Sequence, residues 1–323
     1  MKAIVQDRYG GTEQLRLDEL PDPVPAAGEV LVRVGAAGVD RGTWHAMAGM
    51  PLAARLALGL RAPRDRTPGR DVAGTVEGVG GGVTDFAVGD AVYGTARGSF
   101  AELAVVPVKR LARRPANLSV EEAAAVPVSA LTALQALRAA RVGEGDRVLV
   151  IGASGGVGSY AVQLATDLGA HVTGVCGSTK LDLVRSLGAE RVVDHTTTPL
   201  DGLGERFDVV VDIAGHRPVG LLRSLLTERG RLVVVGSETG GRWLGGLQRS
   251  IGAALLSPFV RQRLVMLAAS EDGADLATLT EVIERGGVRP ALERSFPLEE
   301  AGAAIDHVAS GRARGKVVVS LTG

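Results

Sequence analysis

The stretch RVLVIGASGGVGSYAVQLATDLG, from Arg147 to Gly169, decides the fold of this chain. It begins with an apolar, largely β-branched run from Val148 to Ile151, which is typical of a strand buried on both faces. A glycine-rich turn follows from Gly152 to Gly158. Apolar residues then recur at helical spacing, at Ala161, Leu164, Ala165 and Leu168. Strand, glycine turn and helix in this order predict the start of a βαβ unit.

The turn itself has the pattern of a dinucleotide-binding site. It reads Ala153-Ser154-Gly155-Gly156-Val157-Gly158, which is G-x-G-x-x-G with alanine at the first glycine. Small residues let the backbone approach a pyrophosphate, and the helix N-terminus offers unpaired N–H groups and the positive end of its dipole. A tight structural turn is the alternative, but it would make the flanking strand and helix patterns a coincidence. These six residues are therefore predicted to bind a dinucleotide.

The composition limits the possible functions. With 323 residues the chain is long enough for about two domains with a sizeable core. Its 36 basic and 36 acidic side chains balance, so no net charge attracts nucleic acid or an anionic membrane. The single cysteine, Cys176, excludes an internal disulfide and a multi-cysteine metal site. Since neither a signal-peptide pattern nor a membrane-spanning apolar run is found, we expect a cytoplasmic protein without nucleic acid or stable membrane insertion.

The pattern changes along the chain. Residues 1–119 read as short strands divided by Gly and Pro turns, which predicts a β-rich domain or partial barrel. From about Glu121 a helical stretch runs to residue 140, and strands then alternate with helices. Expected strands include residues 171–176, 191–194, 207–213 and 231–235, with a helix at 218–227. Such repeated βα units predict a parallel, doubly wound α/β sheet, while residues 288–321 could complete either domain.

Several segments together carry a family resemblance: EVLVRVGAAGVDRGTWHAMAG, PGRDVAGTVEGVG, VTDFAVGDAVYG, AAAVPVSALTALQAL, IGASGGVGSYAVQLA, LGAERVVDH and ARGKVVV. In this order, over nearly the whole chain, they resemble the medium-chain dehydrogenase/reductase superfamily, and more closely its zinc-independent quinone oxidoreductase branch, which is related to zeta-crystallin. The resemblance implies a GroES-like catalytic domain at 1–119, a Rossmann NADPH-binding domain at 120–288 and a C-terminal return to the catalytic domain at 289–323. It also implies an active site in the cleft between the domains and a homodimer.

The same resemblance bears on zinc. Zinc-dependent relatives place a cysteine where this chain has Asp40, and a His-Glu pair where it has Arg70-Asp71. Their structural lobe of four cysteines has no counterpart here. A catalytic zinc needs three ligands of Cys, His or carboxylate type, and Asp40, His45 and Asp71 do not keep the family pattern. We expect no metal site.

The choice of cofactor depends on the end of the second strand of the βαβ unit. An NAD site usually has Asp or Glu about 20 residues after the glycine turn, to bind the ribose 2′-hydroxyl. Here the sequence is VCGSTKLD, with Ser178 and Lys180 at that place. A hydroxyl and an ammonium can bind a 2′-phosphate, which a carboxylate would repel. Similar quinone oxidoreductases use this Ser-x-Lys pattern for NADPH, although Ser178 could also cap a helix and Lys180 could be solvated.

Four further residues are carried over from the resemblance as cofactor contacts. Thr132 matches a threonine that faces the nicotinamide end of the cofactor, or is a plain helix residue. His195 stands where many relatives have a tyrosine near the 2′-phosphate. Gly236 and Ser237 end the strand RLVVVGS, where the backbone approaches the nicotinamide, although a glycine at a strand end needs no ligand.

The expected reaction is hydride transfer from NADPH to a quinone or to the C=C of an α,β-unsaturated carbonyl compound, because no zinc polarises a carbonyl. Candidate catalytic residues are Asp40, His45 and Tyr93, each of which could instead serve packing or capping. Alternatives are a tailoring enoyl reductase or ketoreductase of a secondary-metabolite pathway, and a non-catalytic NADPH-binding protein. The roles of two further segments are left open by the sequence. Residues 239–262 could cap the site, form a subunit contact or touch a membrane. Four arginines could bind an acidic substrate tail or lie in a solvated loop, namely Arg61, Arg64, Arg66 and Arg70.

Overall fold

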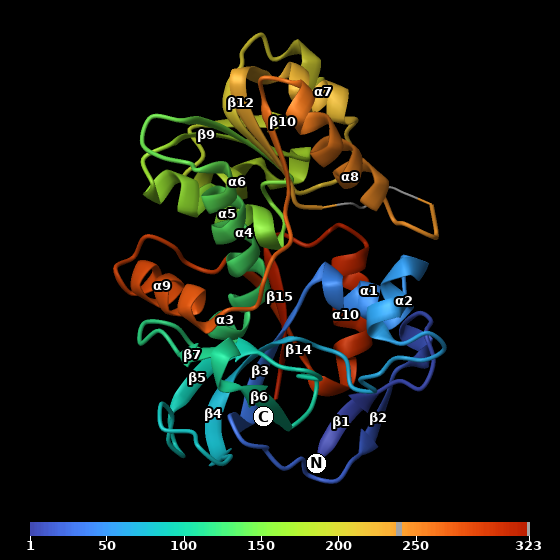
Figure 1. The fold of residues 1–323 in the computed structure, drawn as a ribbon. Coiled ribbons are helices and arrows are strands. Elements are labelled where there is room, and N and C mark those ends of the chain that lie inside the picture. Colours follow the sequence, from blue (N-terminus) through green and yellow to red (C-terminus); the bar gives the residue numbers. More distant parts are fainter. Residues whose placement is uncertain (237–240, 322–323) are drawn as a thin grey trace. The chain divides into compact units, whose positions relative to one another are not determined.

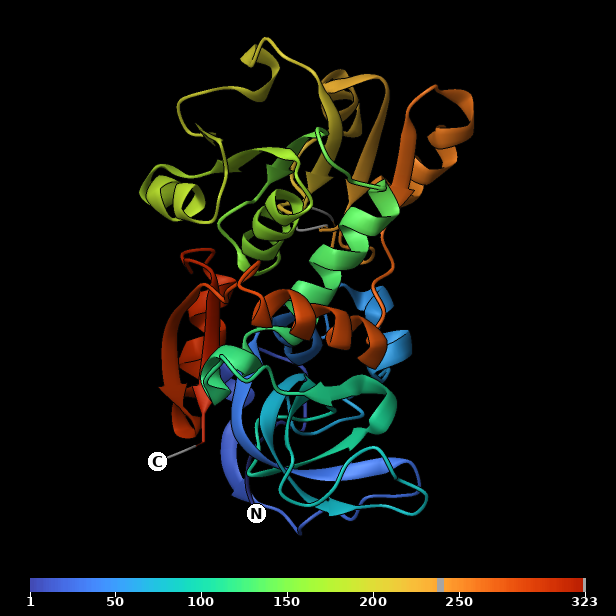
Figure 2. The same ribbon diagram turned by 90° about the vertical axis from the view of Figure 1, so that its left-hand side faces the viewer.

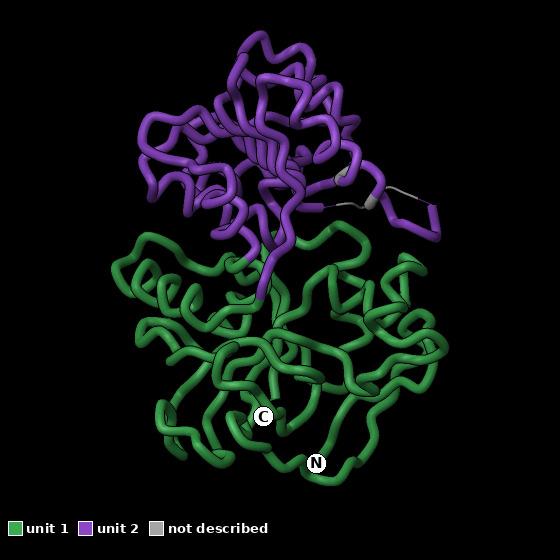
Figure 3. The backbone as a smooth tube through the Cα atoms, in the orientation of Figure 1, with its two compact units in different colours: residues 1–131, 271–323 green, residues 132–270 purple. Residues whose placement is uncertain are grey.

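The computed structural model describes residues 1–236 and 241–321, which form two compact units. Unit 1 comprises Met1–Leu131 and Glu271–Gly323, and unit 2 comprises Thr132–Ser270 (Figure 3). The chain leaves unit 1 within helix α4 (Pro127–Ala140) and returns between Ser270 and Glu271. No helix in the described ranges has both the length and the apolar character needed to cross a bilayer.

Unit 2 is built on a parallel sheet. In its described residues six strands lie in the order β10-β9-β8-β11-β12-β13, of which Figure 1 labels β9, β10 and β12. Their bounds are β8 Arg147–Ile151, β9 His171–Cys176, β10 Arg191–Asp194, β11 Phe207–Asp212, β12 Leu226–Val234 and β13 Arg263–Met266. Numbered along the chain this is the Rossmann order 3-2-1-4-5-6, so the predicted α/β doubly wound sheet is confirmed. Val148, Leu149 and Val150 in the central strand are fully buried, as a strand covered on both faces requires.

Helices cover this sheet and complete its core. They are α4, α5 (Gly156–Asp167), α6 (Leu181–Ser186), α7 (Val219–Ser224) and α8 (Leu247–Leu256). One apolar cluster joins strand residues such as Leu149, Val210 and Leu232 to Leu222 of α7 and Ala253 of α8. This packing fixes the positions of the C-terminal ends of the strands and of the loops that follow them.

Unit 1 has a mostly antiparallel sheet. In its described residues the strand order is β14-β15-β3-β4-β5-β7, and β6 also pairs with β3. The bounds are β3 Glu29–Val39, β4 Asp71–Val79, β5 Ala91–Thr95, β6 Leu103–Pro107, β7 Leu111–Arg113, β14 Leu292–Pro297 and β15 Lys316–Ser320. A separate hairpin pairs β1 (Lys2–Val5) with β2 (Arg16–Glu19). Because β15 pairs with β3, the C-terminal strands, red in Figure 2, belong to the same unit as the N-terminal strands.

The helices of unit 1 are α1 (Arg41–Ala48), α2 (Arg55–Leu58), α3 (Val120–Ala124), α9 (Gly273–Glu284) and α10 (Ala301–Ala309). Two of them, α3 and α9, were expected in the Rossmann domain. Residues 120–131 and 271–288, expected in the Rossmann domain, lie in unit 1. The reason is packing: α3 contacts β3 and β4, and α9 contacts β7.

Two expected helices are shorter in the structure. The helical pattern of residues 121–140 is divided into α3 and α4, since Pro127 cannot donate a backbone hydrogen bond but suits a first helical turn. The helix expected at 218–227 ends at Ser224, because β12 already begins at Leu226 beside β11. Helix α1 was not expected from the sequence.

Candidate functional site

The glycine turn of unit 2 lies between β8 and α5, where a dinucleotide pyrophosphate would bind. Gly155 is the N-cap of α5 in extended conformation, and no side chain caps the helix there. A Cβ added to Gly158 would collide with the carbonyl oxygen of Gly152, so this position tolerates only glycine. The structure thus places Ala153, Ser154 and Gly155 in the turn and Gly156, Val157 and Gly158 at the start of α5, whose uncapped N-terminus fits an anion.

A polar cluster follows the ends of β9 and β10. Ser178 Oγ lies 2.9 Å from Thr196 Oγ1, and the Thr196 hydroxyl donates to Asp194 Oδ1 at 2.7 Å. His195 is exposed, and its backbone N–H donates to Cys176 O at 3.1 Å. Its ring Nε2 would lie 3.8 Å from a Cβ on Gly177, so His195 borders the same loop as Ser178 and Lys180. The three predicted 2′-phosphate residues therefore lie at one edge of the sheet.

Both hydroxyls of this cluster are engaged at the Asp194 carboxylate. The single proton of the Thr196 hydroxyl is donated to Asp194, and the Ser178 hydroxyl lies within hydrogen-bond distance of Thr196 Oγ1. The side chains of Ser178 and Thr196 hold the pKa of the Asp194 carboxyl below its usual value. Asp194 is therefore ionised and orients both hydroxyls. A phosphate at this edge would draw its charge-assisted hydrogen bonds mainly from Lys180.

The end of β12 is fixed by an arginine that the sequence analysis did not single out. Gly236 comes so close to Ile213 that a Cβ would collide with the Ile213 carbonyl oxygen. Arg249 of α8 donates to Gly236 O at 2.7 Å and to Asp212 Oδ2 at 2.5 Å. Asp212 is fully buried at the end of β11, and burial raises the pKa of its carboxyl despite the opposing effect of Arg249. Ser237, the neighbouring predicted contact, lies outside the described residues.

Thr132 is the first residue of unit 2, within α4, and its side chain is half-buried. Its expected approach to the nicotinamide remains a prediction.

The main candidate acceptor site in unit 1 is a cavity of about 480 Å³. Met47, Leu58, Pro63 and Ala96 give it apolar walls, and Thr43 and His45 of α1 also line it. His45 Nδ1 lies 2.9 Å from Met50 O, and because a carbonyl only accepts, this nitrogen carries a proton. The other ring nitrogen can donate a proton only when the imidazole is charged.

Asp40, the second candidate catalytic residue, is the N-cap of α1. Its Oδ1 accepts from the Thr43 backbone N–H at 2.8 Å, which is the usual role of an N-cap carboxylate. Its buried Oδ2 has no hydrogen-bond partner within the described residues. Asp40 does not line the cavity. Its local geometry is therefore that of a helix cap.

Tyr93, the third candidate, has a packing role in the structure. Its side chain is fully buried, and its hydroxyl donates to Leu276 O at 2.7 Å and lies 2.9 Å from Thr280 Oγ1 in α9. Burial raises the pKa of this phenol well above its usual value. A phenol that is buried, bonded and hard to ionise is better placed for packing than for supplying a proton to a substrate, so this geometry favours the packing alternative for Tyr93, and a catalytic role stays a prediction.

The residues at the family's zinc positions do not fit a metal site. Asp71 is fully buried, its Oδ2 lies 3.1 Å from Lys316 Nζ, and its Oδ1 accepts from the Val128 backbone N–H at 2.8 Å. Lys316 also donates to Ser129 Oγ at 3.1 Å. Both carboxylate oxygens are thus held inside unit 1, and the described residues contain no group of three or more His, Cys, Asp or Glu side chains placed for a metal ion. Lys316 and Ser129 were not foreseen from the sequence.

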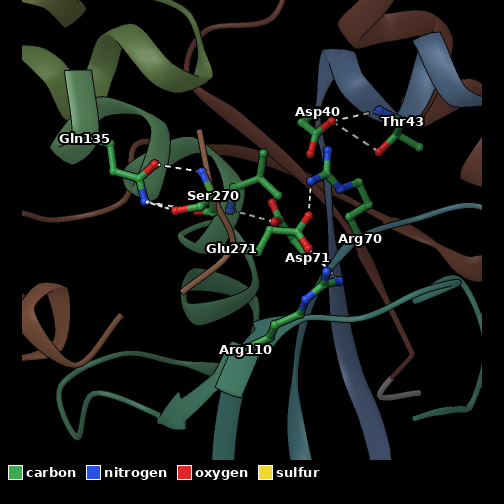
Figure 4. Close-up of polar contacts among 9 residues, drawn as sticks. Asp40, Thr43, Arg70, Asp71, Arg110, Gln135, Ser270 and Glu271 are labelled. Carbon is green, nitrogen blue, oxygen red and sulfur yellow. Dashed lines mark hydrogen bonds and ion pairs between the residues drawn. The ribbon is translucent and has the colours of Figure 1, made fainter. Parts of the chain in front are cut away.

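Arg70 instead takes part in an arginine–glutamate–arginine arrangement beside the cavity. Glu271 forms ion pairs with Arg70 and, at 2.7 Å, with Arg110, as Figure 4 shows. All three residues belong to unit 1 and line the cavity. The partners are far apart in sequence, so no local pattern could have indicated them.

Comparisons with known proteins agree with this architecture. Residues 26–116 match the model of the alcohol dehydrogenase GroES-like domain, and residues 187–319 match that of a zinc-binding dehydrogenase. The chain is 32% identical to a chloroplast envelope quinone oxidoreductase homolog of Arabidopsis thaliana over 99% of its length and 98% of the relative. It is also 32% identical to an NADPH-dependent alkenal/one oxidoreductase of the same plant, over 99% of this chain and 79% of that one.

A solved structure gives the same result. The quinone oxidoreductase from Coxiella burnetii is 28% identical, with a TM-score of 0.85, and the likeness covers 99% of both chains. The GroES-like match, the Rossmann-type sheet and the full-length relatives together show that this chain is an oxidoreductase of the medium-chain dehydrogenase/reductase superfamily, in its zinc-independent quinone oxidoreductase branch.

Proposed function

We propose that this chain is a zinc-independent, NADPH-dependent reductase that transfers hydride to a quinone or to the C=C of an α,β-unsaturated carbonyl compound. The observation that carries the proposal is the cavity of unit 1, which has apolar walls for a flat, electron-poor acceptor. Of the residues at the family's zinc positions, Asp71 is engaged by Lys316, and Arg70 carries a guanidinium, which is not a metal ligand and which pairs with Glu271. The names of the relatives support both acceptor classes.

Different residues of the chain would bind the cofactor and assist the reaction. NADPH, when bound, supplies the hydride. The uncapped N-terminus of α5 would hold its pyrophosphate, and Lys180 with Ser178 would hold the 2′-phosphate. His45 in its charged form would donate a proton to the enolate or hydroquinone oxygen, with solvent as the alternative donor. Because positioning carries most of this chemistry, we expect few essential side chains.

The decisive experiment is a panel of acceptors tested in parallel with NADPH and NADH. It would contain 1,4-naphthoquinone, an alkenal such as trans-2-hexenal, an enone such as 3-penten-2-one, and a saturated ketone. Oxidation of NADPH by a quinone or enone, with NADH much less effective and a chelator without effect, is the expected result. If no acceptor oxidises NADPH, the proposed activity is wrong.

Two outcomes of the panel would favour the alternatives. Reduction of the saturated ketone, with simple quinones inactive, would indicate a ketoreductase of a biosynthetic pathway. Tight NADPH binding without turnover on any acceptor would indicate a non-catalytic nucleotide-binding protein. A cytoplasmic location and a homodimer remain predictions from the sequence and the resemblance; light scattering on the purified protein tests the dimer.

A further inference from the structure

The acceptor cavity of unit 1 has a positively charged rim. Four arginines from three separate segments line it: Arg64, Arg70, Arg97 and Arg110. Against them stand two lining carboxylates, Asp65 and Glu271. Arg64 and Arg70 precede β4, Arg97 follows β5, and Arg110 ends a short 3-10 helix before β7. The fold thus gathers cations around a cavity whose walls are otherwise largely apolar.

Glu271 is an example of a carboxylate bound between arginines of this rim. Its carboxylate, only 16% exposed, contacts both Arg70 and Arg110, so a carboxyl group from the chain already occupies the position between these two guanidinium groups. Burial, and then repulsion from Arg97 and Arg70, lower the pKa of the Arg110 guanidinium, so these three arginines lie close enough to act on one another.

Arg64 and Arg97 have no ion pair within residues 1–236 and 241–321, although both line the cavity. Arg66, in the same loop, differs from them: it forms an ion pair with Asp7 at 2.7 Å and does not line the cavity. The structure therefore separates the arginines of this loop into cavity-lining and outward-facing members. Arg64 and Arg97 are exposed at the mouth of the cavity, and guanidinium groups there without a carboxylate partner are suited to an anionic ligand.

We propose that the preferred acceptor carries an anionic substituent, a carboxylate or a group of similar charge, which Arg97 and Arg64 bind while the apolar walls hold the reducible ring or C=C. This inference rests on the proposed function and narrows its substrate class. Asp65, exposed at the same rim, opposes the arginines, so the net attraction comes from the four cations exceeding the two anions.

The test compares two acceptors that differ only in charge: a 1,4-naphthoquinone with a short alkyl carboxylate side chain, and its primary amide. The wild-type enzyme should reduce the acid with a kcat/KM about tenfold higher than the amide, as expected for a charge-assisted hydrogen bond. Rising ionic strength should reduce this preference. Arg97→Gln and Arg64→Gln should each lower the acid-to-amide ratio, whereas Arg66→Gln, the matched control, should leave it unchanged.

The outcomes separate this inference from the proposed function. If the acid and the amide are reduced with equal kcat/KM, the inference of an anionic acceptor is overturned, but the proposed reductase function is not affected. If the enzyme reduces neither the acid nor the amide, and none of the neutral acceptors of the panel, the proposed reductase function itself is overturned. A rise in the Kd for NADPH in Arg97→Gln, with an unchanged acid-to-amide ratio, would assign the rim to cofactor phosphates and also overturn the inference.

Discussion

At the scale of single residues, Lys180 is the position that should decide between the two nicotinamide cofactors. Because the hydroxyls of Ser178 and Thr196 are engaged with Asp194 and with each other, the ammonium group provides most of the attraction for a 2′-phosphate. Lys180→Ala should raise the KM for NADPH about tenfold or more, the value of a charge-assisted hydrogen bond, and Ser178→Ala should raise it less. Steady-state kinetics with NADPH and NADH measure both. Equal losses for the two cofactors would remove Lys180 from the 2′-phosphate site.

Tyr93 provides a second test at this scale, between packing and catalysis. In Tyr93→Phe the carbonyl of Leu276 keeps a bond from Thr280 Oγ1 at 3.1 Å, so we expect a loss of only about 1 kcal/mol in unfolding free energy. The turnover number should stay within twofold of the wild-type value. A large fall in kcat without a change in thermal unfolding would restore Tyr93 as a proton donor.

What could be predicted of the site depended on how local its signals are. The six turn residues from Ala153 to Gly158 and the pair Ser178 and Lys180 follow strands directly, so spacing alone indicated them. Arg110 and Glu271 are separated in the sequence by the whole of unit 2, and no pattern in either segment predicts their ion pair. For Tyr93 the sequence left packing and catalysis as alternatives, because an aromatic residue in a strand gives the same pattern whether its hydroxyl contacts a substrate or α9.

At the scale of elements, the strands of the parallel sheet were the most predictable. The expected strands at 171–176 and 191–194 agree with the structure, because short runs rich in β-branched residues between glycine or polar turns have few alternatives. Helix α1 was missed, since its eight residues, RGTWHAMA, lie among segments that read as short strands, and it begins at the Asp40 cap.

The ion pair between Asp212 and Arg249 should fix helix α8 to the ends of β11 and β12. Arg249→Met leaves a buried carboxylate unpaired, which should cost about 3–5 kcal/mol at neutral pH. The folded pKa of Asp212 is raised, so folded Asp212 takes up a proton at a higher pH than the unfolded chain does. Stability is therefore lost as the pH rises from the ordinary carboxyl value through the folded pKa, and the variant should regain stability as the pH falls.

Urea unfolding of the variant at pH 7.5 and pH 5 measures this effect. Arg261→Met is the matched control, because Arg261 pairs with Glu228 in the same unit but both side chains are well exposed. A penalty for Arg249→Met that is as small as that of the control would mean that α8 is held by its apolar contacts alone.

At the scale of the whole molecule, unit 1 is assembled from both ends of the chain, and the buried pair of Asp71 and Lys316 joins them. Burial raises the pKa of Asp71, and Lys316 counteracts this. Lys316→Met removes the counter-charge and should destabilise unit 1 by about 3–5 kcal/mol. The double variant Asp71→Asn/Lys316→Met, which has no charge left at this pair, should recover much of that loss. Its asparagine can still accept from the Val128 N–H.

The two tryptophans allow each unit to be followed separately, since Trp44 lies in unit 1 and Trp243 in unit 2. In a Trp243→Phe background, fluorescence during urea unfolding reports on unit 1. The Lys316→Met change should shift its midpoint to lower urea, and adding Asp71→Asn should shift it back. Additive losses in the double variant would show that the two residues act independently, and the buried pair would then not be what holds the C-terminal strand in unit 1.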